Sequence, residues 1–194
     1  MSNLKTKILA RSKLIEKNLK LIEESIVEIS NLVTKTIEND GKLMFCGNGG
    51  SAAECQHMSA EYCATLDHRN PRPGIASISL TTDSSFLTAW TNDFGYKDVF
   101  SRQVSTIGNK GDLLFCYSTS GNSENVCEAA KIAIKKNIKV VGFTGNSKET
   151  KLEKYCDLVF KSPSNQTPII QEFHTLAGHE ICSEVEKNIF FEKK

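Results

Sequence analysis

The first forty residues carry the pattern of an amphipathic helix. Between residues 4 and 38, leucine and isoleucine recur at helical spacing, with lysine and glutamate between them, so the apolar side chains share one helix face. No glycine or proline precedes Gly41, and one long helix, or two with a break near residues 24–25, fits the segment. We expect residues 1–40 to form a helical extension that buries its apolar face on the domain or on another copy of the chain.

From Lys42 the pattern changes to short β-prone runs that alternate with helical stretches. The predicted strands are residues 42–46, 74–80, 112–117, 138–144 and 157–161. The predicted helices are residues 51–66, 83–90, 123–136, 148–154 and 168–190, with a loop and a short helix over residues 91–110. This alternation predicts an α/β fold, a three-layer doubly wound (flavodoxin-like) parallel sheet flanked by helices, with right-handed crossovers. No repeat or linker interrupts it, so we expect a single domain over residues 1–194.

Composition and charge narrow the classes of function. The 24 basic and 23 acidic residues give a net charge of +1, which lacks the basic footprint of a nucleic-acid-binding protein. No apolar run approaches the ~20 residues of a membrane-spanning helix. Residues 1–7 have no apolar stretch behind their lysines, as a secretion signal would. We therefore expect no nucleic-acid partner, no membrane association and a cytoplasmic location.

The seven cysteines are odd in number and include no C-x-x-C pair. Most of them lie among apolar or helix-forming residues. This usage is typical of reduced thiols that serve as small hydrophobic side chains in a cytosolic protein. We expect neither a disulfide framework nor a cysteine-based zinc site.

A glycine-rich turn follows the first predicted strand, where ligands bind in parallel sheets. In Gly47-Asn48-Gly49-Gly50-Ser51, the glycines allow close backbone approach, and Ser51 is expected to cap the next helix. A tight turn without a ligand is the simpler interpretation. A dinucleotide motif, G-x-G-x-x-A, also fits, but it requires an acidic residue at the end of the next strand. That strand ends in two threonines, so NAD binding is not favoured.

A second loop, Ser118-Thr119-Ser120-Gly121-Asn122-Ser123, follows the third predicted strand. Its four hydroxyl groups stand at the start of a helix, where free N–H groups and the helix dipole favour a phosphate monoester. A helix cap needs fewer hydroxyls than this. No lysine completes a Walker pattern, so nucleoside triphosphate hydrolysis is not expected.

Two pairs of polar residues have helical spacing. His57 and Glu61 are four positions apart and share a helix face. Gln171 and His179 are eight positions apart and can face the same side of the last helix. Each pair alone is more typical of a surface or a satisfied core. Together they offer two imidazoles, a carboxylate and an amide oxygen, a donor set suited to a divalent ion such as zinc, provided that the two helices meet.

Four segments together resemble the phosphoheptose isomerases of the sugar-isomerase (SIS) domain family. These segments are CGNGGSAAECQH, TNDFGYKDVFSRQ, GDLLFCYSTSGNSENV and QEFHTLAGHE. The loop STSGNS alone indicates only the SIS superfamily, whereas its combination with NGGS, H-x-x-x-E, NDFG and Q-x-x-x-x-x-x-x-H is much more specific. The resemblance covers essentially the whole chain and implies a SIS-type doubly wound fold.

The resemblance also implies a reaction and its residues. The implied enzyme converts sedoheptulose 7-phosphate to D-glycero-D-manno-heptose 7-phosphate through an enediol, at the start of bacterial heptose synthesis for lipopolysaccharide or capsule. It is implied to be a homotetramer with shared active sites and one zinc ion per subunit. The implied metal ligands are His57, Glu61, Gln171 and His179, and the implied proton-transfer groups are Glu61 and His179. The implied substrate contacts are Asn48, Gly49, Gly50, Ser51, Glu61, Asn92, Asp93 and Gln171, with Ser118, Thr119, Ser120 and Ser123 at the phosphate.

The chain departs from the family pattern at two positions. Thr65 stands where many relatives have an arginine four residues after the glutamate, and Pro168 stands where relatives often have an acidic residue. Both changes reduce polar contact with the sugar. Two other functions compete: a non-catalytic SIS scaffold that binds the replication initiator, and a sugar-phosphate-sensing module of a regulator. The complete set of ligand and acid–base residues favours the enzyme, and the lack of a DNA-binding segment speaks against the regulator.

Overall fold

Five parallel strands form one sheet in the computed structural model, which describes residues 3–192. The strands are β1 (Leu43–Gly47), β2 (Ser77–Ser79), β3 (Leu113–Tyr117), β4 (Lys139–Thr144) and β5 (Leu158–Lys161). Their order, β2-β1-β3-β4-β5, confirms the predicted doubly wound sheet. The strand order reverses between β1 and β3: β2 lies on one side of β1, and β3, β4 and β5 follow on the other. Folds of this kind bind ligands at such a switch point, outside the carboxyl ends of the strands.

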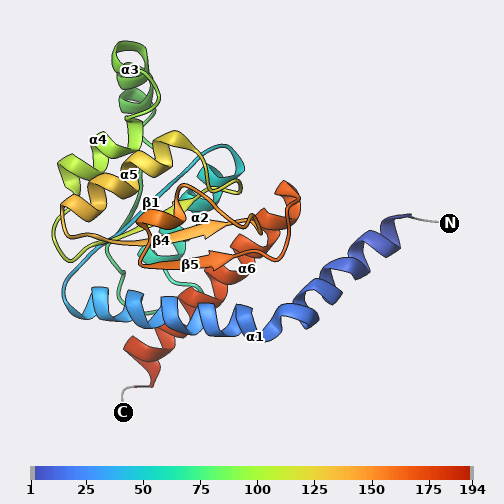
Figure 1. Cartoon of the computed structure of the whole chain (residues 1–194). Helices are drawn as coiled ribbons and strands as arrows, with labels where there is room; N and C mark the ends of the chain where they lie inside the picture. Colours follow the sequence, from blue (N-terminus) through green and yellow to red (C-terminus); the bar gives the residue numbers. More distant parts are fainter. Residues whose placement is uncertain (1–2, 193–194) are drawn as a thin grey trace.

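Six helices surround the sheet (Figure 1). They are α1 (Asn3–Glu38), α2 (Gly50–Cys63), α3 (Ser84–Phe94), α4 (Val99–Ile107), α5 (Glu124–Lys135) and α6 (Thr167–Glu186). Two short turns, η1 (Glu153–Tyr155) and the π-helical η2 (Lys187–Phe191), complete the set. The N-terminal segment is thus one helix of 36 residues rather than two.

Three predicted elements differ from the structure. The helix expected over residues 148–154 is wrong: only η1 forms there, because the segment ahead of it holds the neighbouring loop, with the Leu152 N–H donating to the Gly121 carbonyl (3.0 Å). The helix expected over residues 83–90 extends to Phe94 and absorbs part of the expected loop. The strand expected over residues 74–80 is reduced to β2, an edge strand that pairs with β1 at three positions.

Alternate residues of the inner strands enter one of two cores, because successive side chains of a strand point to opposite faces of the sheet. Phe45 and Phe115 pack under α1, α2 and α6, whereas Met44 and Leu114 pack under α4 and α5. Five of the seven cysteines are buried in these cores, in keeping with their predicted use as small hydrophobic side chains. The two-sided burial fixes the register of the strands, and therefore the positions of the loops at their carboxyl ends.

Helix α1 has two parts with different surroundings. All its buried residues lie in the second half, from Ile22 to Thr36, where it packs against α6 and β5. The first half extends away from the sheet (Figure 1), and Ile8, Leu9 and Leu19 there are at least half exposed. Arg11 holds this part to α6 through an ion pair with Glu172 (2.7 Å). None of the described helices combines the length and apolar character needed to cross a membrane.

Candidate active site

Helices α2 and α6 meet at a cluster of three titratable side chains. The Nε2 atoms of His57 and His179 lie 2.7 Å apart, and Glu61 Oε1 lies 3.8 Å from His57 Nε2. One ligand atom from each residue falls within 4.8 Å of the others. The packing of α2 against α6 therefore brings His57, Glu61 and His179 together.

The donor types of the cluster suit a cation. At 2.7 Å the two imidazole nitrogens are at hydrogen-bond distance, where one ring donates an N–H and the other accepts it. Two histidines and a carboxylate are a common donor set for zinc. His57 and Glu61 are partly exposed, with side-chain accessibilities of 44% and 22%, so an ion or a substrate can reach them from solvent.

Gln171 lies at the junction of the glycine turn and α6. A Cβ atom built on Gly50 would lie only 2.4 Å from Gln171 Nε2, so a glycine is required for this close approach. Gln171, Gly50, Ser51 and His57 line one cavity of about 420 Å³. The structure thus brings the amide to the same cavity wall as one of the two histidines.

Glu54 and Thr175 also line this cavity and were missed by the sequence reasoning. The Thr175 hydroxyl donates to Glu54 Oε2 (2.6 Å), and Glu54 Oε1 is buried without a hydrogen-bond partner among residues 3–192. The available signal was helical spacing, since Glu54 lies one turn before His57 on the same face. Its partner is 121 positions away, which periodicity does not reveal.

His174 forms the buried side of the cavity. It is 1% exposed, and its Nε2 donates to the Thr144 carbonyl (3.1 Å). Burial lowers the pKa of His174 to about 4, because the charged imidazolium is poorly solvated there. The Nδ1 atom has no partner within the described chain, so this side chain is a neutral, structural histidine near neutral pH.

Three hydroxyl groups of the loop after β3 lie close together. Ser118 Oγ lies 2.9 Å from Ser123 Oγ and 3.5 Å from Ser120 Oγ. Gly121 adopts a φ of +63°, and any side chain there would collide with Thr150. The remaining loop hydroxyl belongs to Thr119, whose carbonyl accepts the Gly145 N–H (3.1 Å). The backbone is therefore fixed from both sides, and the Ser118 hydroxyl accepts the Ser123 N–H at the start of α5 (3.4 Å).

The residue that caps the start of α2 differs from the predicted one. Ser51 does not cap α2: it lies inside the helix, and the N-cap is Gly49, without a side-chain cap bond. The positive φ of Gly49, 57°, lets the helix begin at Gly50, one residue earlier than Ser51. Asn48 lies at the end of β1 and exchanges hydrogen bonds with Asn125 of α5 (2.9 Å each).

Asn92 and Asp93 are not brought to this site within one chain. They lie on α3 rather than in a loop, both exposed, and Asn92 Nδ2 donates to Asp93 Oδ1 (2.8 Å). Helix α3 buries none of its described residues and projects away from the sheet (Figure 1). Neither residue lines the α2–α6 cavity.

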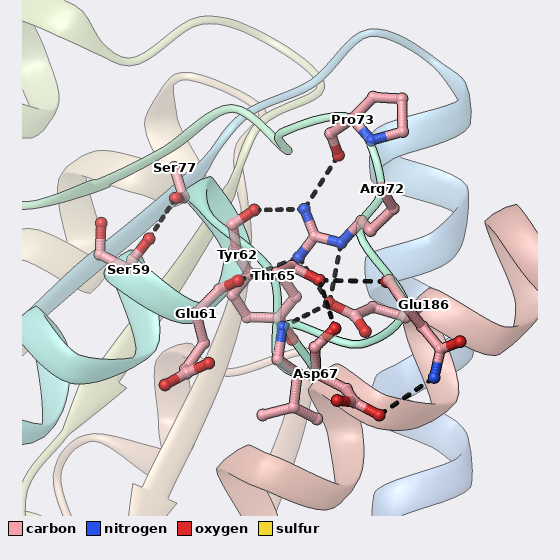
Figure 2. A network of polar contacts seen from close by, with 11 residues as sticks. Ser59, Glu61, Tyr62, Thr65, Asp67, Arg72, Pro73, Ser77 and Glu186 are labelled. Carbon is pink, nitrogen blue, oxygen red and sulfur yellow. Dashed lines mark hydrogen bonds and ion pairs between the residues drawn. The ribbon is translucent and has the colours of Figure 1, made fainter.

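A buried ion pair joins the far ends of α2 and α6 (Figure 2). Arg72 and Glu186 have side-chain accessibilities of 1% and 6%, with N–O contacts of 2.8 Å. Arg72 also donates to the carbonyls of Glu61 (3.0 Å) and Tyr62 (2.7 Å), the last turn of α2. In Figure 2 the carboxylate of Glu61 points away from the guanidinium. Arg72 therefore fixes the backbone of Glu61 and makes no contact with its carboxylate. Because Arg72 is buried, it does not take over the ligand contact of the arginine that many relatives have at the position of Thr65.

Comparisons with known proteins agree with this geometry. The model of the SIS domain matches residues 9–145. The chain is 43% identical over 181 residues to a phosphoheptose isomerase of Aliarcobacter butzleri, covering 93% of this chain and 94% of that protein. The structure is similar to a phosphoheptose isomerase from Neisseria gonorrhoeae (TM-score 0.87, 36% identity, 95% and 97% of the two chains). It is also similar to one from Francisella tularensis (TM-score 0.90, 28% identity, 97% and 100%).

The five-stranded parallel sheet and the serine-rich loop at its switch point define a SIS domain. The coverage narrows the class further. The similarity to the phosphoheptose isomerases runs over nearly the full length of this chain and of those proteins. The chain belongs to the phosphoheptose isomerase family of SIS-domain proteins.

Proposed function

We propose that this protein isomerises sedoheptulose 7-phosphate to D-glycero-D-manno-heptose 7-phosphate. The observation that carries the proposal is the convergence of His57, Glu61 and His179 from two helices, in a chain similar along its length to phosphoheptose isomerases. Gln171 approaches the glycine turn and lines the same cavity as His57. A carboxylate and an imidazole side by side are the acid–base pair that a ketose–aldose isomerisation needs.

The reaction moves a carbonyl from C2 to C1. In our proposal, Glu61 removes a proton from C1, next to the C2 carbonyl, and returns it to C2. His179 moves the hydroxyl proton between the two oxygens, so the intermediate is a cis-enediol. The two side chains lie on facing helices within 4.8 Å of each other, close enough for both to reach neighbouring carbons of one substrate.

The serine-rich loop holds the phosphate in this proposal. Ser118, Thr119, Ser120 and Ser123 donate hydroxyl hydrogens, and the start of α5 favours the negative charge. This binding energy comes from a group that does not react, so it orients the sugar carbons toward Glu61 and His179. Asn48, Gly49, Gly50 and Ser51 line the sugar at the neighbouring turn.

A zinc ion fits the two imidazoles and the carboxylate, with Gln171 as a fourth oxygen donor. When bound, it would stabilise negative charge on the enediol oxygens without a proton transfer of its own. Metal binding lowers the basicity of a carboxylate, so proton transfer by Glu61 requires a change in how that side chain is held.

We further propose a homotetramer with shared active sites, located in the cytoplasm, whose product enters lipopolysaccharide or capsule synthesis. Two features support the assembly. Helix α3, which carries Asn92 and Asp93, buries none of its described residues, and the first half of α1 exposes apolar side chains. The competing scaffold function has no observation in its favour.

The test is turnover by the purified protein with zinc supplied. We expect sedoheptulose 7-phosphate to be converted to an aldose phosphate, and Glu61→Gln to lower kcat by about 10²- to 10⁴-fold with an unchanged circular dichroism spectrum. Glu180→Gln is the matched control, because Glu180 is an exposed carboxylate next to His179. An inactive wild-type protein would contradict the function, and an unchanged Glu61→Gln rate would remove Glu61 from the mechanism.

A further inference from the structure

The side chain of Asn48 is held by two partners from distant parts of the chain. Asn48 Nδ2 donates to Asn125 Oδ1, and Asn125 Nδ2 donates back to Asn48 Oδ1, both at 2.9 Å. The hydroxyl of Tyr96 reaches the same Asn48 oxygen at 2.8 Å. Asn125 is 4% exposed, so its amide has no alternative partner in water.

A backbone group determines which way these amides face. The Val126 N–H donates to Asn125 Oδ1 (3.0 Å), and a backbone N–H can only donate. That atom of Asn125 is therefore the oxygen, and its nitrogen faces Asn48. Asn48 must then present its own oxygen to Asn125 Nδ2, and the Tyr96 hydroxyl must donate to this oxygen. The orientation of Asn48 follows from the first turn of α5.

Counting the hydrogen-bonding capacity of Asn48 shows what remains for a ligand. An amide oxygen has two lone pairs, and Asn125 and Tyr96 occupy both. An amide nitrogen has two hydrogens, and Asn125 Oδ1 takes one. One N–H is left, so Asn48 acts on a ligand only as a hydrogen-bond donor.

The cavity beside Asn48 offers further donors. It measures about 310 Å³ and is lined by Asn48, Tyr96, Lys97, Ser123, Glu124 and Asn125. The ammonium of Lys97 lies 3.2 Å from the Glu124 carboxylate, which offsets its charge. Ser123 also belongs to the serine-rich loop. A sugar phosphate bound at that loop would therefore lie beside the cavity that Asn48 lines.

We propose that Tyr96 and Asn125 are positioning residues that hold the amide of Asn48 as a donor to an acceptor oxygen of the bound sugar phosphate. This inference rests on the proposed function and assigns residues that act on the substrate through Asn48. Tyr96 follows α3 directly, so it also ties the base of the projecting helix to the site.

The test is a double-mutant cycle between Tyr96→Phe and Asn48→Ala, with sedoheptulose 7-phosphate as substrate. Tyr96 is half exposed, so removing its hydroxyl leaves the fold intact. One neutral hydrogen bond corresponds to about a three- to tenfold effect, so we expect Tyr96→Phe to raise KM by that factor with kcat nearly unchanged. In the Asn48→Ala background the same substitution should have no effect. Tyr155→Phe, which removes a phenol hydroxyl that does not contact Asn48, is the matched control.

Three results would overturn the inference: an unchanged KM in Tyr96→Phe, an equal effect of Tyr96→Phe in both backgrounds, or an equal effect of Tyr155→Phe. Calorimetric titration of the same four cycle proteins with sedoheptulose 7-phosphate separates this inference from the proposed function. Binding with the expected coupling but without turnover would support the positioning role and contradict the isomerase. Absence of binding to the wild-type protein would refute both, whereas turnover without coupling would refute only the positioning role.

Discussion

Removing the charge of Glu186 tests the buried ion pair that joins α2 to α6. In Glu186→Gln, the guanidinium of Arg72, 1% exposed, keeps its contacts with the carbonyls of Glu61, Tyr62 and Pro73 but loses its counter-charge. Breaking a buried pair by removing one partner costs about 3–5 kcal/mol. Because the carbonyl contacts and one amide oxygen remain, we expect the lower end, about 3 kcal/mol.

Arg72→Met should cost more than Glu186→Gln. Within the described chain it leaves the Glu186 carboxylate with the Leu66 N–H as its remaining donor (2.9 Å). It also removes a donor from the carbonyls of Glu61 and Tyr62, of which Tyr62 keeps the Ile75 N–H (3.0 Å). We therefore expect about 4–5 kcal/mol. The double variant Arg72→Met/Glu186→Leu removes both charges, so its cost should be well below the sum of the single costs.

Urea unfolding followed by circular dichroism measures these differences, and a loss of 3 kcal/mol lowers the Tm by roughly 6–12 °C in a chain of this size. The control is Glu184→Gln, because the pair of Glu184 with Lys187 is exposed and 3.9 Å long. It should change stability by less than about 0.5 kcal/mol. If Glu186→Gln cost no more than this control, the buried pair would not hold the two helices together.

Three further predictions address the site. Gly50→Ala should displace the Gln171 amide, since the new Cβ would lie 2.4 Å from its Nε2; we expect turnover to fall at least about tenfold with little change in urea midpoint. Ser120→Ala should raise KM for the sugar phosphate about three- to tenfold in steady-state assays, because one hydroxyl of the cradle is lost. His174 should make stability fall as the pH decreases from 6.5 to 4, since the unfolded imidazole binds a proton at its ordinary pKa and the folded one only near pH 4. This loss, about 3 kcal/mol, should be absent from unfolding curves of His174→Gln.

Each of these expectations has a contrary result. Full activity of Gly50→Ala would show that the position of Gln171 is unimportant for turnover. An unaltered KM for Ser120→Ala would count against the phosphate cradle. Parallel pH–stability curves for the wild-type protein and His174→Gln would show that His174 is not buried in its neutral form.

The sequence predicted the elements with local signals best. Buried strands such as residues 112–117 are continuous apolar runs, and the hydrophobic pattern of α1 spans the whole helix. The prediction over residues 148–154 failed because tertiary contacts with Gly121, invisible in local propensity, determine that segment. The prediction that Ser51 caps α2 was wrong because Gly49 adopts a positive φ, from which the helix starts before Ser51.

The site divides in the same way. Helical spacing predicted that His57 and Glu61 share a face, and the family resemblance joined them to His179 across 122 positions. Glu54 and Arg72 were missed because their partners lie 121 and 114 positions away. Such pairs depend on how α2 and α6 cross, which no single segment encodes.

The two edges of the sheet limit how copies of this chain can associate. At one edge, β2 offers only three residues for pairing, too few to accept a strand from another molecule. At the other edge, β5 has four residues and packs against α1. These short edges disfavour edge-to-edge growth, the common route from soluble sheets to aggregates, at both ends of the sheet. If copies of this chain associate, their helices offer a better contact surface than their strands do.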